Sequence, residues 1–166
     1  MAELSDHMLK LMMGGDDRAT APARSNAKPD PQEVHHATRP VLMERIAHLR
    51  KMAKFGEGSA SEILHEYPQH NVQLSVRLRS GIAELHENFA DLFFILDGPA
   101  TLLSSGTVVK PKVVGPGETR GDCLTDAKEQ ELRPGDIAHI PAGTPHQIVL
   151  SGDATFAALV VKIQER

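Results

Sequence analysis

The chain has 166 residues, enough for one domain with a sizeable core, and 40% of them are hydrophobic. Its formal net charge of −4 argues against a surface for nucleic acid or for an anionic membrane. The single cysteine, Cys123, cannot form an internal disulfide, and no apolar run is long enough to span a bilayer. We therefore expect a cytoplasmic protein, although export stays open if the N-terminus is truncated.

The N-terminal third divides into two segments. Residues 1–38 are rich in proline, glycine and polar side chains, and we expect them to form a flexible arm. In residues 39–57, apolar side chains recur at helical spacing, at Leu42, Ile46, Leu49 and Ala53. Pro40 suits a first helical turn and Gly56 suits a helix end, so we predict an amphipathic helix over about residues 40–55.

Residues 58–166 show the signals of short strands. Apolar residues alternate with polar ones at Val72, Leu74, Val76 and Leu78, which predicts a half-buried strand. Further short apolar segments follow at 82–86, 91–96, 100–103, 107–109, 137–140, 147–150 and 155–162. Close spacing of this kind is typical of an antiparallel sandwich or barrel. We expect residues 110–133 to form an extended loop with a short strand near 129–132, and loops of this length are often lids or binding loops.

Two segments concentrate the residues that could carry chemistry. Residues 135–147 read GDIAHIPAGTPHQ, with two prolines, two glycines and two histidines. Proline fixes φ and glycine permits positive φ, so the segment suits a rigid turn that aims a side chain. The aimed group would be an imidazole, the commonest metal ligand among side chains. The alternative is an ordinary strand and turn with incidental histidines.

Together with residues 81–98, this segment resembles the two motifs of the cupin superfamily. The second motif is matched by Gly135, Pro141, Gly143 and His146, without the asparagine that ends it. The first is matched by Gly81, His86 and Gly98, with Asn88 at the second histidine position and Asp91 at the glutamate position. The gap between Asn88 and Asp91 is shorter than is usual in the family. The resemblance covers roughly residues 58–162.

The resemblance implies a jelly-roll barrel, with the N-terminal helix and arm outside it. It also implies that His86, Asp91 and His146 surround one cavity. Two histidines and one carboxylate suit non-haem Fe and also serve Mn, Ni or Zn. The alternative is a cavity without metal, in which these side chains only hydrogen-bond to one another. His139, on the preceding strand, is not expected to be a ligand.

Other polar side chains are candidates for substrate contacts or catalysis. Glu84 and Asn88 share a face with His86 if the strand continues, which makes Glu84 a general base or a rim residue and lets Asn88 orient substrate or water. Arg77 and Arg79 are expected to face solvent, but would hold an anionic ligand if their face lined the barrel. Glu118 and Arg120 are either contacts of a lid or a solvated ion pair.

Three functions fit these residues. The first is a small metal-dependent enzyme, with oxygenase chemistry as one version, acting on a small polar or aromatic molecule. The second is a non-catalytic module that binds a small molecule without metal. The third is a structural dimer with a vestigial site. Leu92, Phe94 and Leu96 should face away from the barrel interior, and an antiparallel strand that is apolar on both faces predicts a homodimer.

Overall fold

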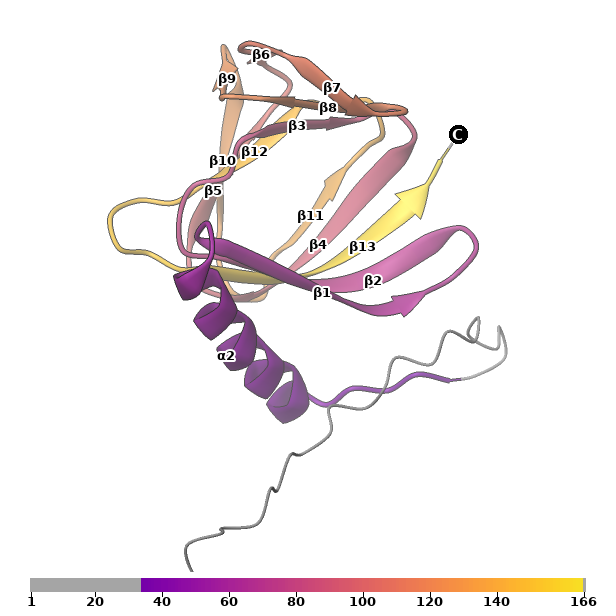
Figure 1. Ribbon diagram of the computed structural model, residues 1–166, viewed down its shortest axis with the longest axis vertical. Helices are drawn as coiled ribbons and strands as arrows, with labels where there is room; N and C mark the ends of the chain where they lie inside the picture. Colours follow the sequence, from indigo (N-terminus) through magenta and orange to yellow (C-terminus); the bar gives the residue numbers. More distant parts are fainter. Residues whose placement is uncertain (1–33, 166) are drawn as a thin grey trace, which may run out of the picture.

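The computed structural model describes residues 34–165, which form one helix and an antiparallel β-barrel (Figure 1). The arm expected over residues 1–38 lies mostly outside the described residues, and the division into arm, helix and barrel stays a prediction. The all-β jelly roll with an N-terminal helix is confirmed. None of the described helical segments combines the length and the apolarity that crossing a membrane requires.

Two sheets build the barrel, and every pairing within them is antiparallel. The first sheet has the order β1 (Ser59–Glu66), β2 (His70–Arg77), β13 (Phe156–Gln164), β4 (Phe89–Asp97), β11 (Ile137–Ile140). The second has the order β10 (Lys128–Leu132), β5 (Ala100–Ser104), β12 (His146–Val149), β3 (Ala83–His86), β8 (Glu118–Gly121), β7 (Lys112–Gly115). A small third sheet pairs β6 (Thr107–Val108) with β9 (Leu124–Thr125).

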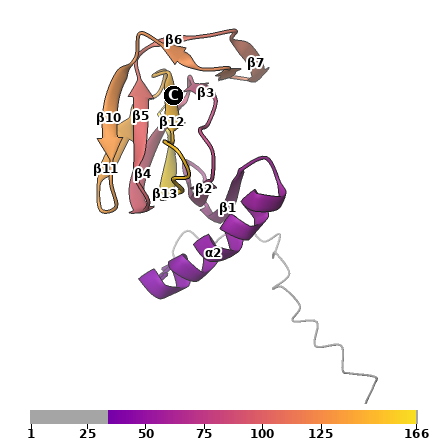
Figure 2. The same ribbon diagram turned by 90° about the vertical axis from the view of Figure 1, so that its left-hand side faces the viewer.

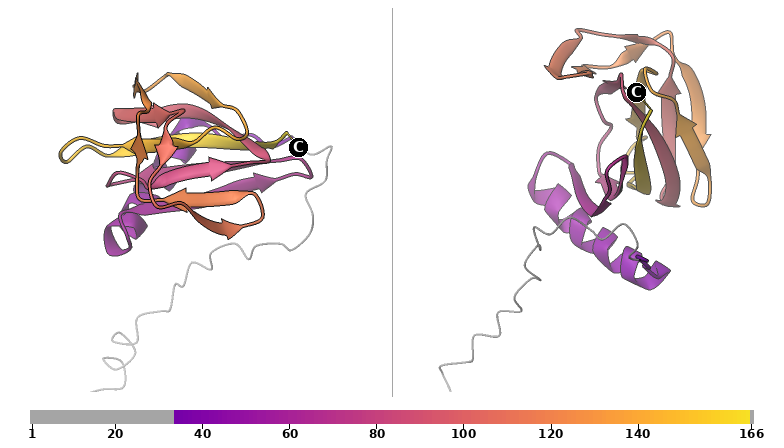
Figure 3. Two further views of the ribbon diagram at one scale, coloured as in Figure 1. Left: turned by 90° about the horizontal axis from the view of Figure 1, so that it is seen from above. Right: turned by 90° about the vertical axis from the view of Figure 1, so that its right-hand side faces the viewer.

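The helix α2 (Arg39–Phe55) confirms the predicted helix to within one residue at its start. Pro40 lies in its first turn, and the Gly56 N–H donates to the Met52 carbonyl oxygen at its end. The buried side of α2 packs on the outside of β1 and β2, as Figures 2 and 3 show. The residues that form this cluster are Ile46, Leu49, Leu74, Val76 and Ala157.

Strand β2 therefore has its apolar face outside the barrel and its polar face inside. Leu74 and Val76 lie under α2. Ser75 and Arg77 alternate with them and pair across to Ala158 and Phe156, which belong to the barrel core. The expectation that Arg77 faces solvent is wrong, because the helix covers the apolar side of the strand and turns its polar side inward. Arg79, beyond the end of β2, is exposed as expected.

The interior of the barrel is apolar over much of its length. Its core cluster contains Phe93, Ile95, Ala100, Leu102, Leu132, Ile140, Ile148, Phe156, Ala158 and Val160. Gly98, in the turn between β4 and β5, has φ +75°, and a Cβ there would overlap the carbonyl oxygen of Thr155. The backbone of this turn therefore lies directly against the backbone of Thr155, the residue before β13.

Residues 110–133 are mostly strand, so the extended loop predicted there is wrong. Strand β10 falls where a short strand was expected, but β7, β8 and β9 were not expected at all. The hairpin of β7 and β8 adds to the second sheet beside β3. In that register Arg120 lies opposite Glu84, and Glu118 lies opposite His86.

Candidate metal centre

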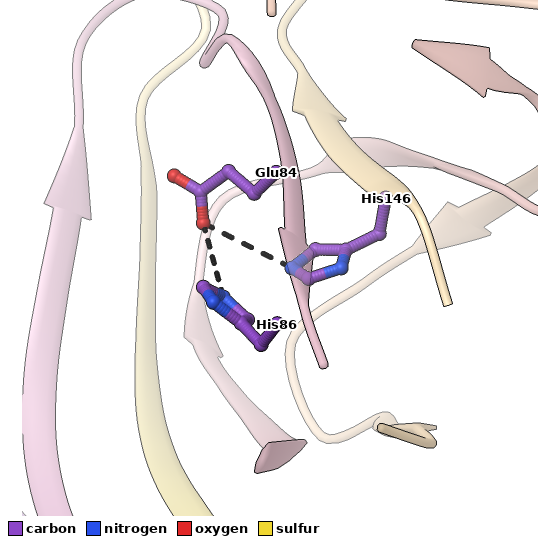
Figure 4. A group of neighbouring side chains, drawn as sticks. All are labelled: Glu84, His86 and His146. Carbon is purple, nitrogen blue, oxygen red and sulfur yellow. Dashed lines mark ion pairs between the residues drawn. The ribbon is translucent and has the colours of Figure 1, made fainter. Parts of the chain in front are cut away.

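Two buried imidazoles meet where β3 ends and β12 begins. His86 is the last residue of β3 and His146 the first of β12, and these strands are neighbours in the second sheet. The ring centroids are 5.3 Å apart, and both side chains are almost fully buried. The turn before His146 is fixed to β3, because the Gly143 N–H donates to the His86 carbonyl oxygen over 2.7 Å. The proline-rich segment thus aims His146 at His86 (Figure 4).

The Nδ1 atom of each ring contacts an oxygen atom. His86 Nδ1 is 2.6 Å from Glu118 Oε2, and His146 Nδ1 donates to the Thr144 carbonyl oxygen over 3.0 Å. A carbonyl oxygen only accepts, so His146 carries a proton on Nδ1 and, when the ring is neutral, a lone pair on Nε2. The Nε2 atoms of both rings are buried without a hydrogen-bond partner among residues 34–165. Two imidazole nitrogens therefore face one point and remain available as ligands.

Two carboxylates face the same point. Glu84 Oε2 lies 3.6 Å from His86 Nε2 and 3.9 Å from His146 Nε2, and Figure 4 shows the three side chains converging. Asp91 Oδ2, from β4, lies 3.4 Å and 3.5 Å from the same two nitrogens. Glu84, His86 and His146 offer ligand atoms that all lie within 4.8 Å of one another. The other oxygen of Asp91 accepts a hydrogen bond of 2.8 Å from Lys162 of β13.

Basic side chains surround these carboxylates. Arg120 Nη1 is 2.9 Å from Glu84 Oε2, and its Nη2 is 3.7 Å from Glu118 Oε2. Arg77 Nη2 is 3.5 Å from Glu84 Oε1. Together with Lys162, three cationic side chains from three strands contact three carboxylates around the imidazole pair. Apart from Asp91, which is almost fully buried, these charged side chains keep between a fifth and a third of their surface exposed.

The pKa values follow from burial and these contacts. Burial alone would lower the pKa of His86, but the contacts with Asp91 and Glu84 outweigh it and raise the pKa to about 9. Burial alone would raise the pKa of Glu84, but His86, Arg120 and Arg77 lower it to about 2. The two histidines and Lys162 likewise hold the pKa of Asp91 well below its usual range, against the effect of burial. Without a metal, His86 therefore carries a proton between ionised carboxylates at neutral pH.

The structure brings together most of the sequence-predicted site residues, but not Asn88 or Arg79. Strand β3 ends at His86, so the shared face assumed for Asn88 does not extend to it. Asn88 lies in the turn before β4, with its side-chain amide beside Gly117. Arg79 is exposed and lies against Gly58, away from the imidazoles. His139 is 52% exposed on the edge strand β11.

The geometry also changes the register in which the first motif is best matched. With Glu84 at the first histidine position and His86 at the second, four residues separate His86 from Asp91. The six-residue spacing from Asp91 to Gly98 is kept. The unusually short gap after Asn88 was the signal in the sequence for this alternative. Glu84 then stands on the strand where the family's motif has its first imidazole.

Glu118 and Arg120 are neither lid contacts nor a solvated pair. Both lie on β8, directly across from His86 and Glu84, and both contact the site. Two hollows lie elsewhere, with volumes of about 420 Å³ and 320 Å³. The larger is beside Pro99 and Val149, at the end of β12 away from His146, and the smaller lies between β10 and β11.

No family model and no curated protein matches the chain. Solved structures do match it. The TT1209 protein of Thermus thermophilus is 19% identical with a TM-score of 0.50, over 74% of this chain and 93% of that one. KdgF from a Halomonas species is 17% identical with a TM-score of 0.46, over 67% and 84%.

A sugar phosphate isomerase of the cupin superfamily from Silicibacter pomeroyi is 22% identical to the chain, with a TM-score of 0.46. The match covers 65% of this chain and only 60% of the length of that protein. At these identities the likeness concerns the fold alone.

Proposed function

We propose that this chain, which has the fold of the cupin superfamily, binds a divalent transition metal and acts as a metal-dependent enzyme on a small molecule. Glu84, His86 and His146 would hold the metal, with Asp91 as a further oxygen ligand. The observation that carries the proposal is the pair of buried Nε2 atoms that face one point and find no hydrogen-bond partner in the described part of the chain.

The residues fit such a metal. Histidines that ligate metals usually donate their other ring nitrogen to a carboxylate or a backbone carbonyl, and His86 and His146 show one of each. Two imidazole nitrogens with carboxylate oxygens suit Fe, Mn, Ni or Zn. Buried polar atoms without partners are rare in folded proteins, and a bound ion is one explanation for them.

A metal bound here would polarise a substrate oxygen or activate a bound molecule, and oxygenase chemistry is one version of this proposal. The chain itself would supply orientation and charge. Glu118 would fix the ring of His86 through Nδ1. With a pKa of about 2, Glu84 is better suited to hold a metal than to take up a proton at neutral pH. Of the two roles for Glu84, metal ligand and general base, the metal ligand is therefore the better supported.

The second candidate is a metal-free module that binds a small molecule. It is favoured by Lys162, which occupies one oxygen of Asp91, and by the raised pKa of His86. A protonated His86 between two carboxylates would form a network that satisfies its charges without an ion.

Metal analysis of purified, untagged protein separates the two candidates. The full chain is incubated with Mn, Fe, Ni or Zn, dialysed, and its metal measured by mass spectrometry. We expect one equivalent of metal for the wild type and almost none for His86→Ala or His146→Ala. His139→Ala is the matched control, because that imidazole is exposed, and it should retain the metal. A wild-type protein that takes up none of the four metals would contradict the enzyme and leave the metal-free module.

We also propose a homodimer in a cytoplasmic setting. Leu96 and Leu159 contact the cluster beneath α2. Leu92 and Phe94 pair with Val161 and Leu159 on the same sheet and are only half-buried. Ile137, opposite Phe94, is 63% exposed. An apolar sheet face of this kind is stabilised when a second subunit covers it. Sedimentation that gives only the 18.0 kDa species at micromolar concentration would contradict the dimer.

A further inference from the structure

We infer that the small molecule bound at this site is an anion, and that Arg77 and Arg120 hold its oxyanion group beside the metal. The inference rests on the proposed metal site and names the chemical class of its ligand. The shared chemistry is that of a carboxylate or a phosphate, since both present two oxygens to the fork of a guanidinium group.

Arg77 reaches the site because a glycine makes room for it. A Cβ at Gly81 would lie 2.6 Å from Arg77 Nη1 and 2.9 Å from Cζ, so the guanidinium lies directly against this backbone. The side chain is 20% exposed, and its only ion pair with a described residue is a loose one of 3.5 Å to Glu84. Arg77 is thus placed beside Glu84, which is its one ion-pair partner among the described residues.

Arg120 also has an unused donor at the site. Its Nη1 is 2.9 Å from Glu84 Oε2, yet the geometry is not that of a hydrogen bond, and Nη1 is buried without a hydrogen-bond partner within residues 34–165. Leaving a buried donor unpaired is unfavourable, and more so for a charged group. An oxygen atom of a ligand beside Glu84 would satisfy it.

The charge balance favours an anion once a metal is bound. The three carboxylates Glu84, Asp91 and Glu118 balance the three basic groups Arg77, Arg120 and Lys162 when both imidazoles are neutral. A divalent ion then leaves two positive charges in a largely buried site, where an uncompensated charge is costly. Coordination of Glu84 to the metal would also weaken its attraction for the two arginines. An anionic ligand would compensate both changes.

The test uses the full chain loaded with Mn and three probes: malonate, inorganic phosphate and the neutral sugar glucose. Binding is measured by calorimetry, and metal content is measured on the same samples. We expect malonate or phosphate to bind and glucose not to bind, and the preferred anion identifies the carboxylate or the phosphate as the ligand group. Arg77→Gln and Arg120→Gln should each weaken anion binding about tenfold or more without loss of metal.

Two further variants sharpen the test. Arg79→Gln removes the same charge two residues from Arg77 but outside the site, and should leave anion binding unchanged. Gly81→Ala keeps every charge and displaces Arg77, so it should weaken anion binding as well. Samples that bind metal but neither anion, or that bind an anion equally well in both arginine variants, would overturn the inference alone. Samples without metal would instead overturn the proposed function and this inference with it.

Discussion

The two ends of the barrel interior differ sharply in chemistry. Around Phe156 and Ile148 the interior is filled by apolar side chains that are almost fully buried. Around His86 and His146 it is filled by charges, and the Nε2 atoms of these two rings have no hydrogen-bond partner among the described residues. Burial of apolar side chains stabilises a fold, whereas much of the attraction between buried charges is offset by the cost of removing them from water. One end of the barrel therefore supplies stability and the other is available for binding.

The same strands build both ends. On β12, His146 belongs to the site and Ile148, two residues later, belongs to the core. On β4, Asp91 and Phe93 are related in the same way. Residues two apart on a strand share a face, so the interior changes from charged to apolar over a single step of the pleat. Substitutions at the apolar end should therefore lower stability without loss of metal. Substitutions at the charged end should change metal binding.

The largest effect on stability is expected from the apolar end. Phe156→Ala removes a ring that is 1% exposed and should lower the free energy of unfolding by about 3–5 kcal/mol. Phe55→Ala is the matched control, because that ring is 90% exposed at the end of α2, and its effect should stay within about 0.5 kcal/mol. Urea denaturation measures both. The folded fraction of Phe156→Ala should still bind one metal. Loss of the metal from this fraction would contradict the proposal that one end of the barrel supplies stability and the other binds.

The pH dependence of the charged end should reverse when metal binds. The folded pKa of His86 is raised to about 9, so in the metal-free protein its contribution is fully present below pH 6.5 and is lost as pH rises through 9. The loss is at most about 3 kcal/mol. Glu84, with its pKa lowered to about 2, contributes above pH 4.5 and loses its contribution as pH falls through 2.

Metal must displace the proton of His86, so metal affinity should rise with pH up to about 9. Urea denaturation at pH 6, 7.5 and 9.5, with and without Mn, follows both trends. The metal-free variant His86→Asn should lose most of the alkaline decline. An unchanged decline in that variant would assign it to another group.

A smaller effect should come from Lys162, which competes with a metal for Asp91. Lys162→Met removes the 2.8 Å contact to Asp91 Oδ1 and should raise metal affinity about tenfold, because an anionic ligand is freed and a nearby cation is lost. The metal-free variant should be less stable than the wild type, since Asp91 is left buried with fewer partners. Metal titration measures the first effect, with Lys51→Met on the exposed side of α2 as control. Unchanged affinity would exclude Asp91 from the ligand set.

The smallest effect is expected at the surface. Arg45 of α2 and Glu62 of β1 form an ion pair of 2.6 Å, with 46% and 32% of their side chains exposed. Arg45→Gln should change the free energy of unfolding by about 0.5 kcal/mol or less, because water and salt screen such pairs. Metal binding should not change. A larger loss of stability would mean that docking of α2 depends on this pair as well as on its apolar side.

Local patterns in the sequence predicted most of the fold. The helix follows from its apolar spacing, and β11 (Ile137–Ile140) has the bounds that its apolar run predicted. The hairpin of β7 and β8 could not be predicted in this way, because its residues 112–121 include three glycines and a proline and show no regular apolar alternation. These strands form through pairing with β3, which is distant in the sequence, and β-propensity depends strongly on such a context.

The site was only partly predictable, because some of its residues meet through the pairing of strands that are distant in the sequence. The motif spacing indicated His86, Asp91 and His146, which the structure brings together. Arg120 and Lys162 join them only through cross-strand register, opposite Glu84 and Asp91 respectively. A register between distant strands leaves no local pattern in the sequence. The inward direction of Arg77 likewise depends on the helix that covers the other face of β2.

The glycines of the two motifs should tolerate change to different degrees over evolution. At Gly98 a side chain of any kind would collide with the Thr155 carbonyl oxygen, so no other residue should be accepted at this position. Gly135 and Gly143 also have positive φ, but a Cβ at either would meet open space, so asparagine could replace them at modest cost. A search for distant relatives of this chain should therefore demand glycine at position 98 and accept asparagine at 135 and 143.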